Sequence, residues 1–205
     1  MKPLRLLITM LALLSVPVLV RADQIFDVSL NTSSISGSPF TVAFQLTDGS
    51  GTLDANNTVT ISGLDFGTGG SASGAANLIS GATGNSASGF TLTDSDFFNA
   101  VEQQFIAGSM LSFTFDLTGN FDGITPDEFA FSIEEIATSD PGGALVIADV
   151  GNTPQTFAAS SPYQALGSAQ LATPTSSVPE PSSLLLLGCG IVGAKLACRR
   201  IGSIL

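Results

Sequence analysis

The sequence predicts an all-β domain, an antiparallel β-sandwich or jelly roll of about eight strands. Apolar and polar residues alternate with a period of two in several short stretches, as expected for strands with one buried face. Glycine, asparagine, aspartate, serine or proline bounds each stretch, which is typical of strands joined by tight turns. No convincing long helix interrupts them, and short strands at this spacing favour a sandwich or a jelly roll.

The clearest strand pattern spans residues 39–47, where Phe40, Val42, Phe44 and Leu46 fall on one face. Most of the 14 phenylalanines occupy such positions, so we assign them to the core rather than to a ligand-binding surface. The remaining predicted strands, in chain order, are 25–30, 59–61, 90–92, 111–117, 129–133 and 144–150.

Three segments between or after these strands are less regular. Residues 67–89 are rich in glycine, serine and alanine, which predicts a long loop or a poorly ordered insert. Residues 96–107 are compatible with a helix or with an irregular strand. Residues 152–178 are polar with spaced prolines, so we expect an extended linker after a folded domain at 23–151.

The first 22 residues have the features of a secretion signal. Lys2 and Arg5 precede an apolar run of about 15 residues, which is shorter than the roughly 20 that a membrane-spanning helix needs. Small residues then lead to Ala22, and we expect signal peptidase to cut between Ala22 and Asp23. The predicted signal helix therefore directs the chain to the export machinery.

The last residues, 179–205, combine three features in a fixed order. Pro179, Glu180 and Pro181 form a rigid spacer, an apolar transmembrane helix is predicted at 182–198, and Arg199 and Arg200 follow it. The helix would be about 25 Å long at 1.5 Å per residue, short of a hydrocarbon core of roughly 30 Å. Arg199 and Arg200 are expected to stay cytoplasmic while the domain is exported.

This tail resembles the PEP-CTERM sorting signal, through Pro179, Glu180, Pro181, the leucine-rich span and the pair Arg199 and Arg200. The resemblance implies recognition by an exosortase, a membrane transpeptidase-like processing enzyme, and association with Gram-negative envelopes and exopolysaccharide. The domain itself resembles a group of PEP-CTERM proteins of unknown activity, in residues 26–30 and 140–145. That second resemblance assigns no functional residue.

Charge excludes several classes of function. All six lysines and arginines lie outside residues 22–194, and the chain has no histidine, so the exported domain is strongly acidic. Without basic side chains it cannot neutralise phosphates, which excludes nucleic acid as a partner. Ser-His-Asp triads, lysine nucleophiles and the usual zinc ligands are also missing from the domain. We therefore expect a protein that is not an enzyme.

Carboxylate chemistry remains open. Asn120, Asp122, Asp127 and Glu128 cluster within ten residues, and hard cations such as calcium prefer these oxygen ligands. The four residues are therefore candidate calcium ligands, although acidic turns are also commonly just solvated. No cofactor other than calcium is expected.

From these features we expect an exported protein of the cell envelope or extracellular matrix with a structural or adhesive role. The alternative is a carbohydrate-binding module, with or without help from calcium. A glycoside hydrolase acting through two carboxylates is a third hypothesis; Glu134 and Glu135 fit it poorly because neighbours on a strand point to opposite faces. The expected partners are signal peptidase, the export machinery, an exosortase, the membrane and exopolysaccharide.

Overall fold

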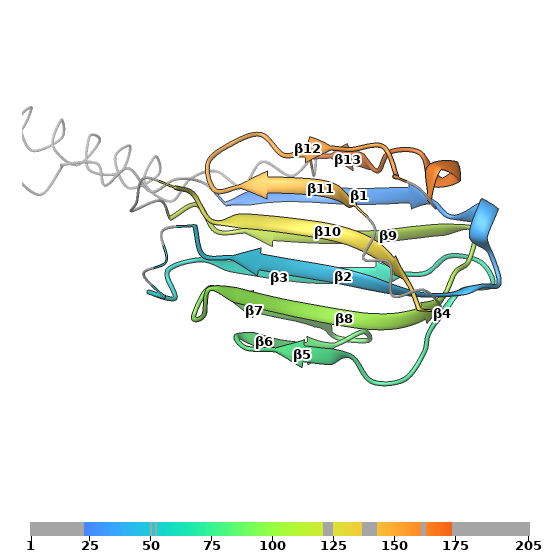
Figure 1. Ribbon diagram of the computed structural model, residues 1–205, viewed down its shortest axis with the longest axis horizontal. Helices are drawn as coiled ribbons and strands as arrows, with labels where there is room; N and C mark the ends of the chain where they lie inside the picture. Colours follow the sequence, from blue (N-terminus) through green and yellow to red (C-terminus); the bar gives the residue numbers. More distant parts are fainter. Residues whose placement is uncertain are drawn as a thin grey trace, which may run out of the picture. The chain divides into compact units, whose positions relative to one another are not determined.

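The structure is a computed structural model that describes residues 23–49, 51, 53–120, 125–136, 143–160 and 163–173. These residues form two antiparallel sheets that enclose a shared core, which confirms the predicted all-β sandwich. Figure 1 shows the sheets as two layers, with β10, β2 and β8 of one sheet lying over β9, β3 and β7 of the other. The predicted signal helix and the transmembrane helix at 182–198 lie outside the described residues. Within the described part, no helix is long and apolar enough to cross a membrane.

The first sheet, sheet A, has the strand order β13-β1-β9-β3-β7-β6. Its strands are β1 (Gln24–Asn31), β3 (Thr58–Asp65), β6 (Ala82–Asn85), β7 (Gly89–Thr93), β9 (Met110–Leu117) and β13 (Gln170–Ala172).

The second sheet, sheet B, has the order β12-β11-β10-β2-β8-β4, and β5 also pairs with β8. Its strands are β2 (Pro39–Thr47), β4 (Ser71–Ala72), β5 (Asn77–Ile79), β8 (Phe98–Ile106), β10 (Glu128–Glu135), β11 (Ala144–Asp149) and β12 (Gln155–Thr156). Two short 3-10 helices, η1 (Ser33–Ile35) and η2 (Gln164–Leu166), complete the described elements.

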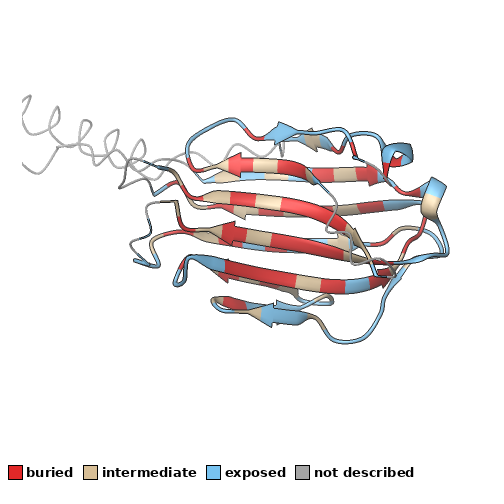
Figure 2. Ribbon diagram, in the orientation of Figure 1, coloured by how far each residue is buried: buried red, intermediate tan, exposed pale blue. Residues whose placement is uncertain are grey.

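Phenylalanine rings from both sheets fill the core. Phe44 on β2 is fully buried, and its ring lies 5.0–6.5 Å, centroid to centroid, from four other phenylalanine rings. These are Phe90, Phe113, Phe129 and Phe131. Buried positions alternate with mostly half-buried ones along β9, and along β2 except at the buried Ala43 (Figure 2), as the period-two pattern predicts. The inward phenylalanines are therefore core residues.

The described residues form 13 strands, more than the eight or so that the sequence predicts, and eight of them have five or more residues. The segment 96–107 supplies one of the long strands, β8. The segment 67–89, in contrast, is not the long loop that its composition predicts, because it contains β4, β5 and β6. Its glycines allow close packing: a Cβ at Gly70 would lie 2.1 Å from the Phe66 carbonyl oxygen. The two short strands β4 and β5 then cover the outer edge of β8.

The segment expected to be a linker also contributes to the sandwich. Its described part contains β12, η2 and β13, and β13 pairs with β1. Tyr163, Leu166 and Ala169 are buried in the core cluster. Ala159 is also part of this cluster, and Leu171 packs against it. These few apolar residues are scattered among polar ones, so the composition of the stretch does not reveal that it is folded.

The described chain begins at one end of the sandwich, and its last strand runs back towards that end. Gln24 at the start of β1 pairs with Leu117, and Ala172 at the end of β13 pairs with Asp27. In sheet B, β2 and β11 finish and β10 begins at this end, where Glu128 pairs with both Thr47 and Asp149. We call it the acidic end, for the carboxylates described next.

Candidate functional site

Buried polar side chains concentrate at the acidic end. There the turns after β2, β7 and β9 meet the segments that precede β3 and β10. Five of the eight buried polar or charged residues of the described chain lie here: Asp48, Asn57, Asp94, Asn99 and Asp127. A buried polar group is costly unless it is hydrogen-bonded, so each needs a partner.

Asn57 connects most of this cluster. Its backbone N–H donates to both carboxylate oxygens of Asp94, at 3.1 and 3.2 Å, and its Nδ2 donates to Oδ2 of Asp127 at 2.7 Å. Its Oδ1 accepts hydrogen bonds from the Thr118 hydroxyl at 2.9 Å and from the Asn120 backbone N–H at 3.0 Å. One asparagine therefore links segments that are far apart in the sequence.

Asp94 and Asp127 form a pair of hydrogen-bonded carboxyl groups. Burial raises the pKa of Asp94 from 3.8 to about 7, and the hydrogen bond to Asp127 and the charges of Asp127 and Asp54 act in the same direction. The hydrogen bond from the Asn57 backbone opposes the rise in this pKa. Two carboxyl groups can share a hydrogen bond only when one of them is protonated, so the raised pKa of Asp94 is what allows this contact.

The four candidate calcium ligands do not all face one point. Asp127 points into the buried cluster, while Glu128, the next residue, is partly exposed at the start of β10. Asn120 is tied to the segment before β3, through its side-chain donation to the Asn56 carbonyl at 2.7 Å. Asp122 lies outside the described residues. Within the described ranges no group of three or more acidic, histidine or cysteine residues is placed to hold a metal ion.

A surface groove of about 400 Å³ adjoins the buried cluster. We call it the Phe97 groove, because Phe97, with 62% of its surface exposed, lines it. Sequence reasoning singled out Glu128 but missed Phe97 and Asp149, which also line the groove. The adjacent pair Phe97 and Phe98 could have indicated it, because neighbouring rings in an extended chain point to opposite sides and at most one of them can enter the core. In the structure both rings are exposed, Phe98 at 40%. The full lining is Thr47, Asp48, Gly49, Phe97, Thr125, Pro126, Glu128 and Asp149.

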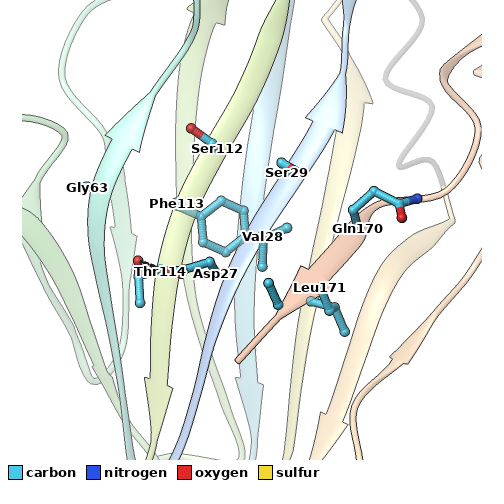
Figure 3. Close-up of a pocket in the computed structure, with 10 residues that line it drawn as sticks. Asp27, Val28, Ser29, Gly63, Ser112, Phe113, Thr114, Gln170 and Leu171 are labelled. Atoms are coloured by element: carbon cyan, nitrogen blue, oxygen red, sulfur yellow. Dashed lines mark hydrogen bonds between the residues drawn. The ribbon is translucent and has the colours of Figure 1, made fainter. Parts of the chain in front are cut away.

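A second depression, of about 280 Å³, lies on the outer face of sheet A. Figure 3 shows small side chains from neighbouring strands around it, among them Ser29, Ser112 and Thr114. The Thr114 hydroxyl donates to Oδ1 of Asp27 at 2.6 Å (dashed in Figure 3). The depression arises because β3 carries Gly63 at an interruption of its pairing with β9. Unlike the Phe97 groove, it has no exposed aromatic side chain.

Comparison with known proteins identifies the C-terminal tail. Residues 177–201 match the family model of the PEP-CTERM protein-sorting motif. The matched stretch contains all five predicted motif residues: Pro179, Glu180, Pro181, Arg199 and Arg200. These five residues lie outside the described part of the structure. Of the two residues at the predicted signal-peptidase site, Ala22 also lies outside it, and Asp23 is the first described residue. Searches of curated proteins and of solved structures found no significant match. The chain therefore carries the PEP-CTERM protein-sorting motif, which makes it an exported exosortase substrate that its tail anchors in the membrane at least transiently.

Proposed function

We propose that the protein is a non-enzymatic component of the cell envelope or extracellular matrix with a structural or adhesive role. The sorting motif at residues 177–201 carries this proposal, because it marks an exported protein for sorting by an exosortase. The acidic composition of the domain supports it, since a strongly charged surface keeps a protein soluble and discourages self-association. The sandwich, held by a large aromatic core without disulfides, suits a domain that works as a scaffold or adhesin.

The alternative, carbohydrate binding, is favoured by the Phe97 groove, which combines an exposed aromatic ring with carboxylates. Adhesion and carbohydrate binding are compatible, because a matrix protein can adhere by holding a polysaccharide. Calcium binding by Asn120, Asp122, Asp127 and Glu128 stays a prediction, and so does the hydrolase hypothesis.

Cell fractionation followed by intact-mass measurement tests the location and the processing. We expect a species that starts at Asp23, ends near Pro181 and is found outside the membrane fraction, because signal peptidase and exosortase remove the two terminal segments. The control replaces Pro179, Glu180 and Pro181 together by alanine, and this variant should keep its tail and remain in the membrane fraction. A native protein that retains Arg199 and Arg200 in the membrane would contradict a free matrix component.

A further inference from the structure

Phe97 stands out among the apolar side chains of the described surface. At 62% exposure it is the most exposed of the large hydrophobic residues there, ahead of Leu53 at 49%. A single exposed apolar side chain is common and needs no explanation by itself. Phe97, however, lines a groove of about 400 Å³, a size within the range of small-molecule sites.

The buried cluster holds the Phe97 segment in place. The backbone carbonyl of Phe97 accepts a hydrogen bond from the Asp48 N–H at 3.1 Å. The side chain of Asn99, which is fully buried, donates to the Asp96 carbonyl at 2.6 Å and to the Leu46 carbonyl at 3.3 Å. The ring is therefore presented from a fixed backbone, which lowers the entropy cost of binding a ligand.

The adjoining turns are equally constrained. The Gly49 N–H donates to Oδ1 of Asp127 at 2.9 Å, and a Cβ at Gly49 would lie 2.0 Å from the Pro126 carbonyl oxygen. The turn after β2 and the segment before β10 thus meet at a distance that only glycine permits. This contact shapes the part of the groove next to Phe97.

Three carboxyl-bearing residues line the groove together with Phe97: the buried Asp48, and Glu128 and Asp149 on the strands of sheet B. Glu128 on β10 and Asp149 on β11 are direct cross-strand partners, which places their side chains next to each other on the outer face of sheet B. Burial, and then the charge of Asp149, raises the pKa of Glu128. Asn152 donates to Oδ2 of Asp149 at 3.3 Å, and Thr47, the partner of Glu128 on β2, adds a hydroxyl group. These groups can accept and donate hydrogen bonds to ligand hydroxyls.

The charge of the domain narrows the choice of ligand. No lysine, arginine or histidine occurs between residues 23 and 194, so no basic side chain of the domain can neutralise a phosphate, sulfate or carboxylate. Acidic ligands would be repelled from a groove lined by carboxylates. The same carboxylates would attract an ammonium group, which is why a basic peptide belongs in the test. The Phe97 ring and the hydroxyl groups of Thr47 and Thr125 also match the apolar face and the hydroxyls of a sugar.

We propose that the Phe97 groove binds a sugar unit of a polysaccharide that lacks acidic groups. Phe97 stacks on the apolar face of the sugar ring, and Glu128 and Asp149 accept hydrogen bonds from its hydroxyls. This inference rests on the proposed adhesive function and names the ligand class and the site through which the adhesion occurs.

Calorimetric titration of the mature protein recovered from cells tests the site. The probes are oligosaccharides of glucan, mannan, galactan, xylan and chitosan, an alginate oligosaccharide as acidic probe, and a lysine-rich peptide. We expect saturable binding of at least one neutral or amino sugar and none of alginate. Phe97→Ala should weaken this binding at least about tenfold, or about 1.4 kcal/mol, because the stacking surface is lost. Phe157→Ala removes another exposed phenylalanine, outside the groove, and should leave the affinity unchanged.

Several results would overturn the inference: no saturable binding of any of the sugars at millimolar concentration, binding of the peptide alone, binding of alginate, or equal affinities of the wild type and Phe97→Ala. Fractionation separates this failure from that of the proposed function. A correctly processed extracellular protein that binds no sugar refutes the site only, whereas a sugar-binding protein that stays in the membrane with its tail refutes the matrix assignment only. Release of reducing ends that Glu128→Gln abolishes would instead establish the hydrolase hypothesis.

Discussion

Replacing Phe44 with alanine is expected to lower the free energy of unfolding by about 3–5 kcal/mol. Phe44 is fully buried between the sheets, and its ring packs against four other phenylalanine rings. The substitution removes a large apolar surface and leaves a cavity that the rigid strands around it cannot fill. Small domains are stable by only about 5–15 kcal/mol, so the loss would be a large fraction of the total.

Urea unfolding, followed by circular dichroism, measures this effect as a lower midpoint concentration. Phe157→Ala serves as the matched control, because it deletes the same group from a position that is 39% exposed, and it should change stability far less. Equal losses in the two variants would contradict the placement of Phe44 at the centre of the core.

The second large effect concerns pH. Asp94 titrates at about 7 in the folded domain, against 3.8 for its ordinary value. Below about pH 4 the carboxyl is protonated in both states and adds no pH dependence. Between about pH 4 and 7 the folded state holds a proton that the unfolded state has lost, so the free energy of unfolding falls as the pH rises. The loss can reach about 4 kcal/mol for a shift of this size and levels off above about pH 7.

Asp94→Asn should remove most of this slope. An asparagine can donate a hydrogen bond to Asp127 and accept one from the Asn57 N–H at any pH, as the protonated carboxyl does. Urea unfolding of both proteins between pH 4.5 and 8 gives the comparison, and Asp96→Asn, which removes a nearby exposed carboxylate, is the control. Stability that rises with pH in the wild type, or an unchanged slope in Asp94→Asn, would contradict the shared proton.

The sequence predicts the fold class because period-two alternation requires no knowledge of partners. Strands such as β2 and β9 can be recognised in the sequence, because each has four apolar residues that point inward. The short strands within residues 67–89 and 152–173 cannot be recognised in this way. They have little apolar surface of their own and are ordered by pairing with β8, β7 and β1. Strand pairing between distant segments cannot be derived from local composition.

The candidate site is less predictable for the same reason. Asn57, Asp94 and Asp127 belong to three separate turns, and only the assembled sandwich brings them into hydrogen-bonding distance. The acidic cluster at residues 120–128 is visible in the sequence, but whether a given carboxylate points inward depends on where β10 begins. Glu128 therefore meets Asp149, a residue that lies within the predicted strand 144–150 and shows no motif.

The placement of the chain ends has a mechanical consequence. The described chain starts at Asp23, at the end that carries the Phe97 groove, and its last strand, β13, runs towards this same end. If a polymer pulls at the groove before the tail is removed, the force passes between the groove and β13, and the far end with η1 lies outside this path. The strand nearest the tether is β13, which has three residues and pairs only with β1 at the sheet edge. Under tension β13 would peel away first, lengthening the tether and relieving the force before the aromatic core opens.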